Sequence, residues 1–197
     1  LWSVGEGFYT CIIGTNLEGM TDLRIMLEMA ERMGIDASEV RSRMEEVKSV
    51  LIEEFERLLV EGGSIREYAI LPGVRGLLTE LSLRAVKLGL ATGNLEYFAR
   101  HKLRMFELEH FFTVASFGDN SFDRREIVEG ALEKTSEERK FLVGDTPADI
   151  DAGRYCKMGV IAVATGSHGM EQLRGYSPEL LVKSLTERDR ILEYLGL

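Results

Sequence analysis

The N-terminal part of the chain has a helical spacing of apolar residues. Over residues 19–60 these side chains recur every three or four positions, which predicts one helix that ends at Gly34 and a second over 37–60. Residues 1–18 are apolar with scattered glycines, and we place no helix in them. Either of two polar residues can cap each helix, Thr21 or Asp22 for the first and Asp36 or Ser38 for the second.

The rest of the chain alternates short apolar runs with helical patterns. After Pro72 and Gly73, a helix is predicted over 74–83. Strands are predicted at 86–91, 111–117, 141–143, 160–164 and 180–182, and helices at 95–106, 123–134, 147–156 and 185–195. Such alternation indicates a parallel, doubly wound sheet. The predicted class is therefore α/β, with a helical domain over 1–70 and a Rossmann-like core over 71–197.

Composition narrows the class of protein. The 197 residues are 45% hydrophobic, which is enough for a sizeable core, but no apolar run reaches membrane-spanning length and no secretory signal pattern is present. The net charge of −9 argues against a nucleic-acid-binding surface. Cys11 and Cys156 match no metal spacing, which favours free thiols in a reducing cytosol. We therefore expect a cytoplasmic protein that binds neither nucleic acid nor a membrane.

Two acidic residues follow the predicted strand at 141–143. Gly144 breaks the apolar run, Asp145 follows it, and Pro147 suits the first turn of a helix. Asp149 then lies about one helical turn from Asp145, at the carboxyl end of a parallel strand, where open α/β sheets bind ligands. The two carboxylates could bind Mg²⁺, or Asp-x-x-x-Asp could be a helix cap followed by a solvated residue.

The wider sequence around these acids carries a resemblance. The string GDTPADIDAGRYCKMGVIAVATG at 144–166 is similar to the fourth motif of haloacid dehalogenase-like (HAD) phosphohydrolases of the phosphoglycolate phosphatase type, and GMTDLRIMLEMAERMGI at 19–35 resembles the start of their helical cap domain. The resemblance covers nearly the whole chain. It implies a cap domain on a Rossmann-like core, Mg²⁺ held by Asp145 and Asp149, and a small phosphorylated metabolite as substrate.

The strand at 86–91 leads into a candidate phosphate loop. Thr92 ends this strand, and a hydroxyl with backbone amides at a helix start can hold a phosphate, although a plain N-cap is the alternative. In HAD enzymes this is the second motif, which implies that Thr92 contacts the transferring phosphoryl group and that Gly93 and Asn94 bind substrate. Arg124 matches the family's phosphate-neutralising cation, with Arg125 close behind. Lys102 lies about two turns into the helix, which favours a solvated or structural lysine over a phosphate contact.

One family motif is absent from the sequence. HAD phosphatases use the first Asp of Asp-x-Asp-Gly-Thr as a nucleophile that forms an aspartyl-phosphate, and this chain has no such string. In the family's strand order that motif ends a central strand between those that end at Thr92 and Asp145. Because buried edges without partners are costly, we expect residues upstream of Leu1 to supply it.

The sequence therefore predicts a Mg²⁺-dependent phosphohydrolase. The alternative is a HAD fold without catalytic activity that serves as a binding or regulatory module, and a dehalogenase is a third option that suits Thr92 less well. Thr165–Gly169 also follows a predicted strand, and this loop is either a substrate contact or a simple turn.

Overall fold

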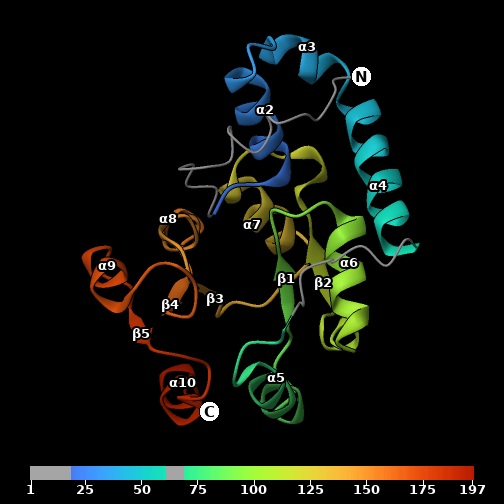
Figure 1. Cartoon of the computed structure of the whole chain (residues 1–197). Coiled ribbons are helices and arrows are strands. Elements are labelled where there is room, and N and C mark those ends of the chain that lie inside the picture. The colour runs from blue at the N-terminus through green and yellow to red at the C-terminus, as the bar shows by residue number, and fades with distance from the viewer. Residues whose placement is uncertain (1–18, 61–68) are drawn as a thin grey trace.

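The computed structural model describes residues 19–60 and 69–197. Figure 1 shows a helical block above two groups of strands, with further helices around the strands. The block consists of α2 (Asp22–Arg32), α3 (Ala37–Ser42) and α4 (Met44–Val60). The core elements, in order, are α5 (Val74–Leu83), β1 (Gly89–Ala91), α6 (Glu96–Met105), β2 (Val114–Ser116), α7 (Arg124–Leu132), β3 (Phe141–Gly144), α8 (Pro147–Tyr155), β4 (Gly159–Val163), α9 (Met170–Gly175), β5 (Leu180–Val182) and α10 (Arg188–Leu195). Two short 3-10 helices, η1 (Glu109–Phe111) and η2 (Gly118–Asn120), flank β2.

The helical block packs onto the start of α6. A shared apolar cluster joins the block to the core, and it contains Leu23, Leu27, Ala30, Val40, Met44 and Leu95, with Phe98 and Phe122 at its edge. Further along α4, the Phe55 ring packs edge-on against Phe98 and Tyr97. The hydroxyl of Tyr97 also donates to Glu56, at 2.7 Å. The block is therefore fixed to the core by apolar contact along both α2 and α4.

The expected single helix over 37–60 is wrong, because the chain breaks at Arg43. The backbone of Arg43 leaves helical geometry, with φ −115° and ψ 20°, and separates α3 from α4. The break lets α4 turn away from α2 and run toward α6 (Figure 1). The structure also selects the caps: Thr21 accepts from Arg24 N, and Asp36 accepts from Ser38 N.

All strand pairings in the described residues are parallel, as the sequence predicts, but they form two separate sheets. β1 pairs with β2, and β3, β4 and β5 pair in that order. Alternate residues of β4 face opposite layers: Ile161 and Val163 pack against α5 and α10, whereas Val160 and Ala162 pack against α8 and α9. The three-stranded sheet thus has the helix-covered faces of a doubly wound fold.

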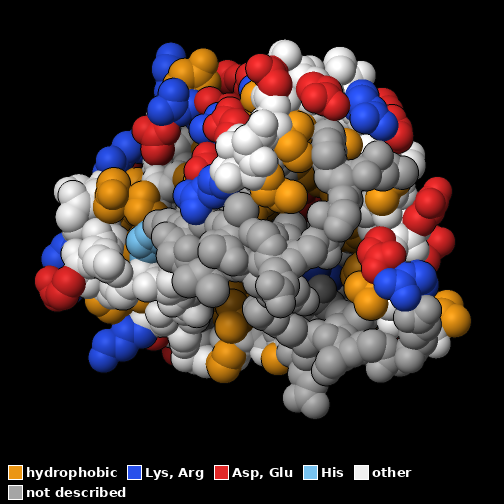
Figure 2. Space-filling view, turned by 45° about the horizontal axis from the view of Figure 1, so that its top comes forward, with side chains coloured by type: hydrophobic (Ala, Val, Ile, Leu, Met, Phe, Trp, Pro, Cys, Tyr) orange, Lys and Arg blue, Asp and Glu red, His pale blue; other side chains and the backbone are white. Residues whose placement is uncertain are grey.

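Strands β1 and β2 are shorter than predicted, and one helix was not predicted. The predicted strand at 111–117 starts in η1 and becomes strand only at Val114. Helix α9 was missed because it is only six residues long. Among the described residues, none of the helices is long and apolar enough to cross a bilayer. Acidic and basic side chains are interspersed on the face shown in Figure 2, and many form ion pairs within one helix.

The two cysteines differ in what the structure describes. Cys11 lies outside the described residues. Cys156 is a free, partly buried thiol at the end of α8, and burial raises its pKa, which disfavours the reactive thiolate.

Candidate active site

The candidate site lies at the carboxyl ends of the strands. Thr92 follows β1, the start of α7 follows β2 and η2, and Asp145 follows β3. Because the strands are parallel, their carboxyl ends lie on the same side of each sheet. The residues before α2 also reach this side, since Asp22 N donates to Gly93 O at 2.8 Å. The fold therefore brings the predicted site residues to the end of the core that the helical block faces.

Asp149 is the most deeply buried charged residue of the predicted site. It is 2% exposed. Its Oδ1 accepts from the Arg124 guanidinium, at 2.9 Å from Nε and 2.7 Å from Nη2. Its Oδ2 accepts from Thr146 Oγ1 at 2.8 Å and from the amides of Thr146 and Asp145 at 3.1 and 3.2 Å. Both carboxylate oxygens are thus engaged within the protein, and the metal-ligand role of Asp149 stays a prediction.

Local sequence explains how Asp149 reaches this position. Thr146 is the N-cap of α8 and Pro147 is its first residue, so Asp149 is the third helical residue and completes a reciprocal capping box with Thr146. Gly144 is required by close contact, because a Cβ on it would lie 2.4 Å from Asp149 Cγ. The alternative that Asp145 caps the helix and Asp149 is solvated is therefore wrong, because Thr146 is the N-cap and Asp149 is buried.

Asp145 has a different environment. Its side chain is half-buried and lies against the loop after β4, where a Cβ built on Gly166 would be 2.2 Å from Asp145 Oδ2. The loop over 165–169 therefore touches the site at Gly166. Within the described parts of the chain, no group of three or more His, Cys, Asp or Glu side chains is arranged to hold a metal ion. Asp145 is a hard oxygen donor that suits Mg²⁺, but a complete coordination shell needs further oxygens.

The two neighbouring arginines point to different partners. Arg124 binds the buried Asp149, whereas Arg125 Nε donates to the exposed Asp151 at 2.7 Å and lies over the Tyr155 ring. The structure thus places Arg124, and not Arg125, against Asp149 at the start of α8. Whether Arg124 also contacts a phosphoryl group stays a prediction.

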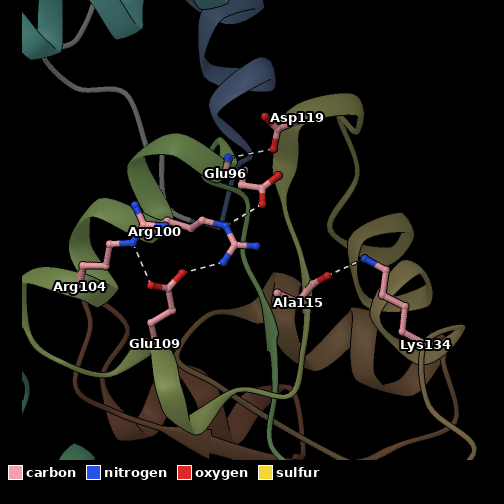
Figure 3. Close-up of polar contacts among 7 residues, drawn as sticks. All are labelled: Glu96, Arg100, Arg104, Glu109, Ala115, Asp119 and Lys134. Carbon is pink, nitrogen blue, oxygen red and sulfur yellow. Dashed lines mark hydrogen bonds and ion pairs between the residues drawn. The ribbon is translucent and has the colours of Figure 1, made fainter.

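The candidate phosphate loop is held by carboxylates. Leu95 N donates to Asp22 Oδ2 at 2.7 Å, and Glu96 N donates to Asp119 Oδ2 at 2.8 Å (Figure 3). These are the first amides of α6, where the sequence predicted that a phosphate could bind. The remaining groups of the loop are the half-buried Thr92 hydroxyl, which accepts from Asn94 N at 3.2 Å, and the buried Gly93.

The side chain of Asn94 is used inside the protein. Its Nδ2 donates to Asp22 Oδ1, and its Oδ1 accepts from Lys102 Nζ, both at 3.0 Å. Lys102 therefore has a structural contact, which is one of the two roles predicted from its position. Figure 3 shows that the next turn of α6 is also ion-paired, since Arg100 contacts Glu96 and Glu109. Arg104 contacts Glu109 as well.

Sequence reasoning missed two residues of this site. Asp22 was one of two possible caps for α2, and its bond to α6 depends on the packing of α2 against the core. Asp119 is an acid in a short loop, and its carboxylate caps a helix that begins 23 residues earlier in the chain. Acids at helix N-termini are favoured by the helix dipole, but spacing along the chain does not indicate which acid serves which helix.

Comparison with known proteins identifies the family of the chain. The family model described as haloacid dehalogenase-like hydrolase matches residues 17–163. A curated relative from Thermotoga maritima, "Phosphorylated carbohydrates phosphatase", is 28% identical over 179 residues, which cover 86% of this chain and 73% of the relative.

Two solved structures illustrate the likeness of fold. A β-phosphoglucomutase from Clostridium difficile aligns with a TM-score of 0.64 and 21% identity over 92% of this chain and 81% of its own. A protein described as a predicted phosphatase from Clostridium acetobutylicum aligns with a TM-score of 0.63 and 21% identity over 89% of this chain and 91% of its own.

Proposed function

Because the chain belongs to the haloacid dehalogenase-like hydrolase family, we propose that it hydrolyses a small phosphomonoester and releases inorganic phosphate. The observation that carries the proposal is the contact of one segment with both loops of the site. Residues Gly19–Asp22 lie against Gly93, beside Thr92, and against Thr146, beside Asp145. The residues that directly follow Thr92 and Asp145 thus contact the same segment. The relative's name points to phosphorylated carbohydrates as the first substrates to test.

The proposed reaction has two steps. A carboxylate oxygen attacks phosphorus, the bond from phosphorus to the substrate oxygen breaks, and the alcohol leaves with a proton from a nearby acid. Water then attacks the phosphorus of the aspartyl-phosphate and gives a proton back to the same acid, which releases phosphate and restores the carboxylate. The nucleophile and the acid belong to the Asp-x-Asp-Gly-Thr motif, which we propose is supplied by residues upstream of Leu1.

The described residues would support both steps. Thr92 would donate its hydroxyl hydrogen to a phosphoryl oxygen, and the loop at Gly93 would let the backbone approach the phosphate. Arg124 would contribute positive charge near the phosphoryl group while Asp149 holds its guanidinium in place. Asp145 would hold Mg²⁺, which when bound offsets negative charge on the phosphate. The helical block, as a cap over residues 1–70, would exclude bulk water.

The test is phosphate release by the full-length protein. Sugar phosphates and other small phosphomonoesters are supplied with and without Mg²⁺, and released phosphate is measured. A Thr92→Val variant keeps the side-chain shape but removes the hydroxyl, and it should lower kcat by about tenfold or more. A covalent intermediate should be trapped by hydroxylamine after acid quenching. A protein that binds these esters but releases no phosphate under any condition supports the binding module and contradicts the phosphatase.

A further inference from the structure

Asp22 connects the helical block to the proposed phosphate loop at three points. Its amide donates to Gly93 O at 2.8 Å, and its two carboxylate oxygens accept from Asn94 Nδ2 at 3.0 Å and Leu95 N at 2.7 Å. The backbones are also in close contact, because a Cβ on Gly93 would lie 2.9 Å from Met20 O. One residue at the start of α2 therefore binds three consecutive residues that follow Thr92.

The bond to Asn94 requires an acceptor at position 22. Lys102 Nζ is a donor only, and it donates to Asn94 Oδ1, which fixes the amide with its Nδ2 toward Asp22. Leu95 N is a second donor aimed at the same side chain. A carboxylate accepts from both, whereas an Asn at position 22 would bring its own NH₂ against one of these donors.

A second route joins the helical block to the same end of α6. Lys48 of α4 is buried, and its Nζ donates to Asp119 O at 3.1 Å, while the Asp119 carboxylate accepts from Glu96 N. Gly118 is also tied to the loop, since its amide donates to Asn94 O at 2.9 Å. The amides of Leu95, the N-cap of α6, and of Glu96, its first residue, thus bind carboxylates that belong to the helical block or are held by it.

Burial disfavours the charged form of the Asp22 side chain. Burial raises its pKa, which is opposed by the bonds from Leu95 and Asn94 and by the charge of Lys102, while the charge of Asp119 raises it further. A cap that served stability alone could be an uncharged Ser or Thr, as Thr21 is for α2. The negative charge of Asp22 is therefore better explained by the hydrogen bonds that its carboxylate accepts from Asn94 and Leu95.

We propose that Asp22 is a positioning residue of the phosphate site: it holds the loop after Thr92 in its working geometry, and it does so only when the helical block is docked on the core. This inference rests on the proposed phosphatase function. It makes the arrangement of Thr92 depend on the position of the cap, so that opening of the block releases Asn94 and the start of α6.

The experiment compares two charge-removing variants of the full-length protein. Asp22→Asn removes the double acceptor, and Asp36→Asn removes a helix-capping charge in the same block, away from the loop. We measure kcat, KM and Tm with a phosphomonoester that the wild type hydrolyses, and amide hydrogen exchange at Leu95 and Glu96. A double variant, Asp22→Asn with Asn94→Asp, returns the donors and acceptors to complementary positions.

The expected result is specific to Asp22→Asn. Its kcat should fall about ten- to hundredfold through misplacement of the loop, with a smaller change in KM and a Tm no lower than that of Asp36→Asn. Exchange at Leu95 should accelerate in Asp22→Asn and return toward the wild-type rate in the double variant. Asp36→Asn should keep wild-type kcat and exchange at Leu95.

Two results would overturn the inference and separate it from the proposed function. If the wild type is active and Asp22→Asn keeps kcat within about twofold of it, Asp22 does not position the site and the phosphatase proposal stands. A kcat that falls only together with Tm, with unchanged exchange at Leu95 well below Tm, shows a structural role alone. If the wild type releases no phosphate from any ester, the proposed function fails first, and the inference fails with it.

Discussion

The guanidinium of Arg124 lies 2.7 Å from Asp149 Oδ1, and this ion pair joins the start of α7 to the start of α8 beneath the Asp145 loop. The Asp149 side chain is 3% exposed and that of Arg124 is 22% exposed, so the pair is largely shielded from water. Removing one partner of such a pair leaves a buried charge without compensation.

Arg124→Ala should therefore cost stability as well as activity. We expect a loss of about 3 kcal/mol in the free energy of unfolding, because the buried Asp149 carboxylate loses its cation. Arg125→Ala is the matched control, since its ion pair with Asp151 is exposed and should contribute at most about 1 kcal/mol. Urea unfolding of both variants measures the difference. Equal losses of unfolding free energy would show that the buried pair of Arg124 with Asp149 stabilises the fold no more than the exposed pair of Arg125 does.

Gly166→Ala should displace the Asp145 carboxylate. A Cβ at this position would lie 2.2 Å from Asp145 Oδ2, so the side chain must move or the loop must shift. We expect phosphate release to fall by about tenfold or more, because misplacement by about 1 Å can cost about a hundredfold. Gly175→Ala is the control, because no atom lies within 4 Å of its Cβ position. Steady-state kinetics of both variants tests this prediction. Unchanged activity of Gly166→Ala would contradict the close contact between Gly166 and Asp145.

Asp145→Asn should weaken Mg²⁺ binding while the fold is retained. The change removes the negative charge but keeps the size of the side chain, and we expect at least about tenfold weaker Mg²⁺ binding, as large as the loss of an outer-shell partner. Asp151→Asn, on the exposed face of α8, should bind Mg²⁺ as the wild type does. Calorimetric titration of both variants tests this, and equal affinities would show that Asp145 is no ligand.

The raised pKa of Asp22 predicts how stability depends on pH. The folded protein holds this proton more tightly than the unfolded chain, in which the pKa has its ordinary value of 3.8, so ionisation of Asp22 destabilises the fold as the pH rises through this interval. Lys102 and Asp119 face the same carboxylate and act in opposite directions. Relative to Asp22→Asn, the wild type should lose stability as the pH rises above 3.8. Urea unfolding at several pH values measures the difference in the free energy of unfolding between the two proteins. A wild type that becomes more stable relative to Asp22→Asn as the pH rises would contradict the prediction.

The edges of β1 and β3 predict a further strand. These two strands do not pair with each other in the described residues, and Val143 on β3 is 46% exposed, which is unusual for a central strand of a doubly wound sheet. We expect a segment that carries Asp-x-Asp-Gly-Thr to occupy this position and pair with both strands. A protein that carries this segment should unfold in a sharper thermal transition than the 197 residues alone. An equally sharp transition for both would contradict the prediction.

Local chemistry explains why much of the core could be predicted. The 3.6-residue spacing of apolar side chains located α2, the Pro-Gly pair at 72–73 located the start of α5, and Pro147 located the start of α8. Arg43 shows where local spacing is insufficient. The apolar stripe continues through this residue, and the helix breaks because α4 packs against α6 while α2 and α3 pack against one another.

The sequence by itself determined the α/β class and the family, and it supplied the acids, hydroxyl and cation that we propose for the site, because each depends on residues that are close together along the chain. Only the tertiary structure decided the partners of these residues. Asp149 binds Arg124, Asp145 meets Gly166, and Asp22 binds the loop after Thr92 across 72 positions of sequence. The geometry of these contacts is set by the packing of helices and loops from distant segments, and no spacing along one helix or strand contains that information.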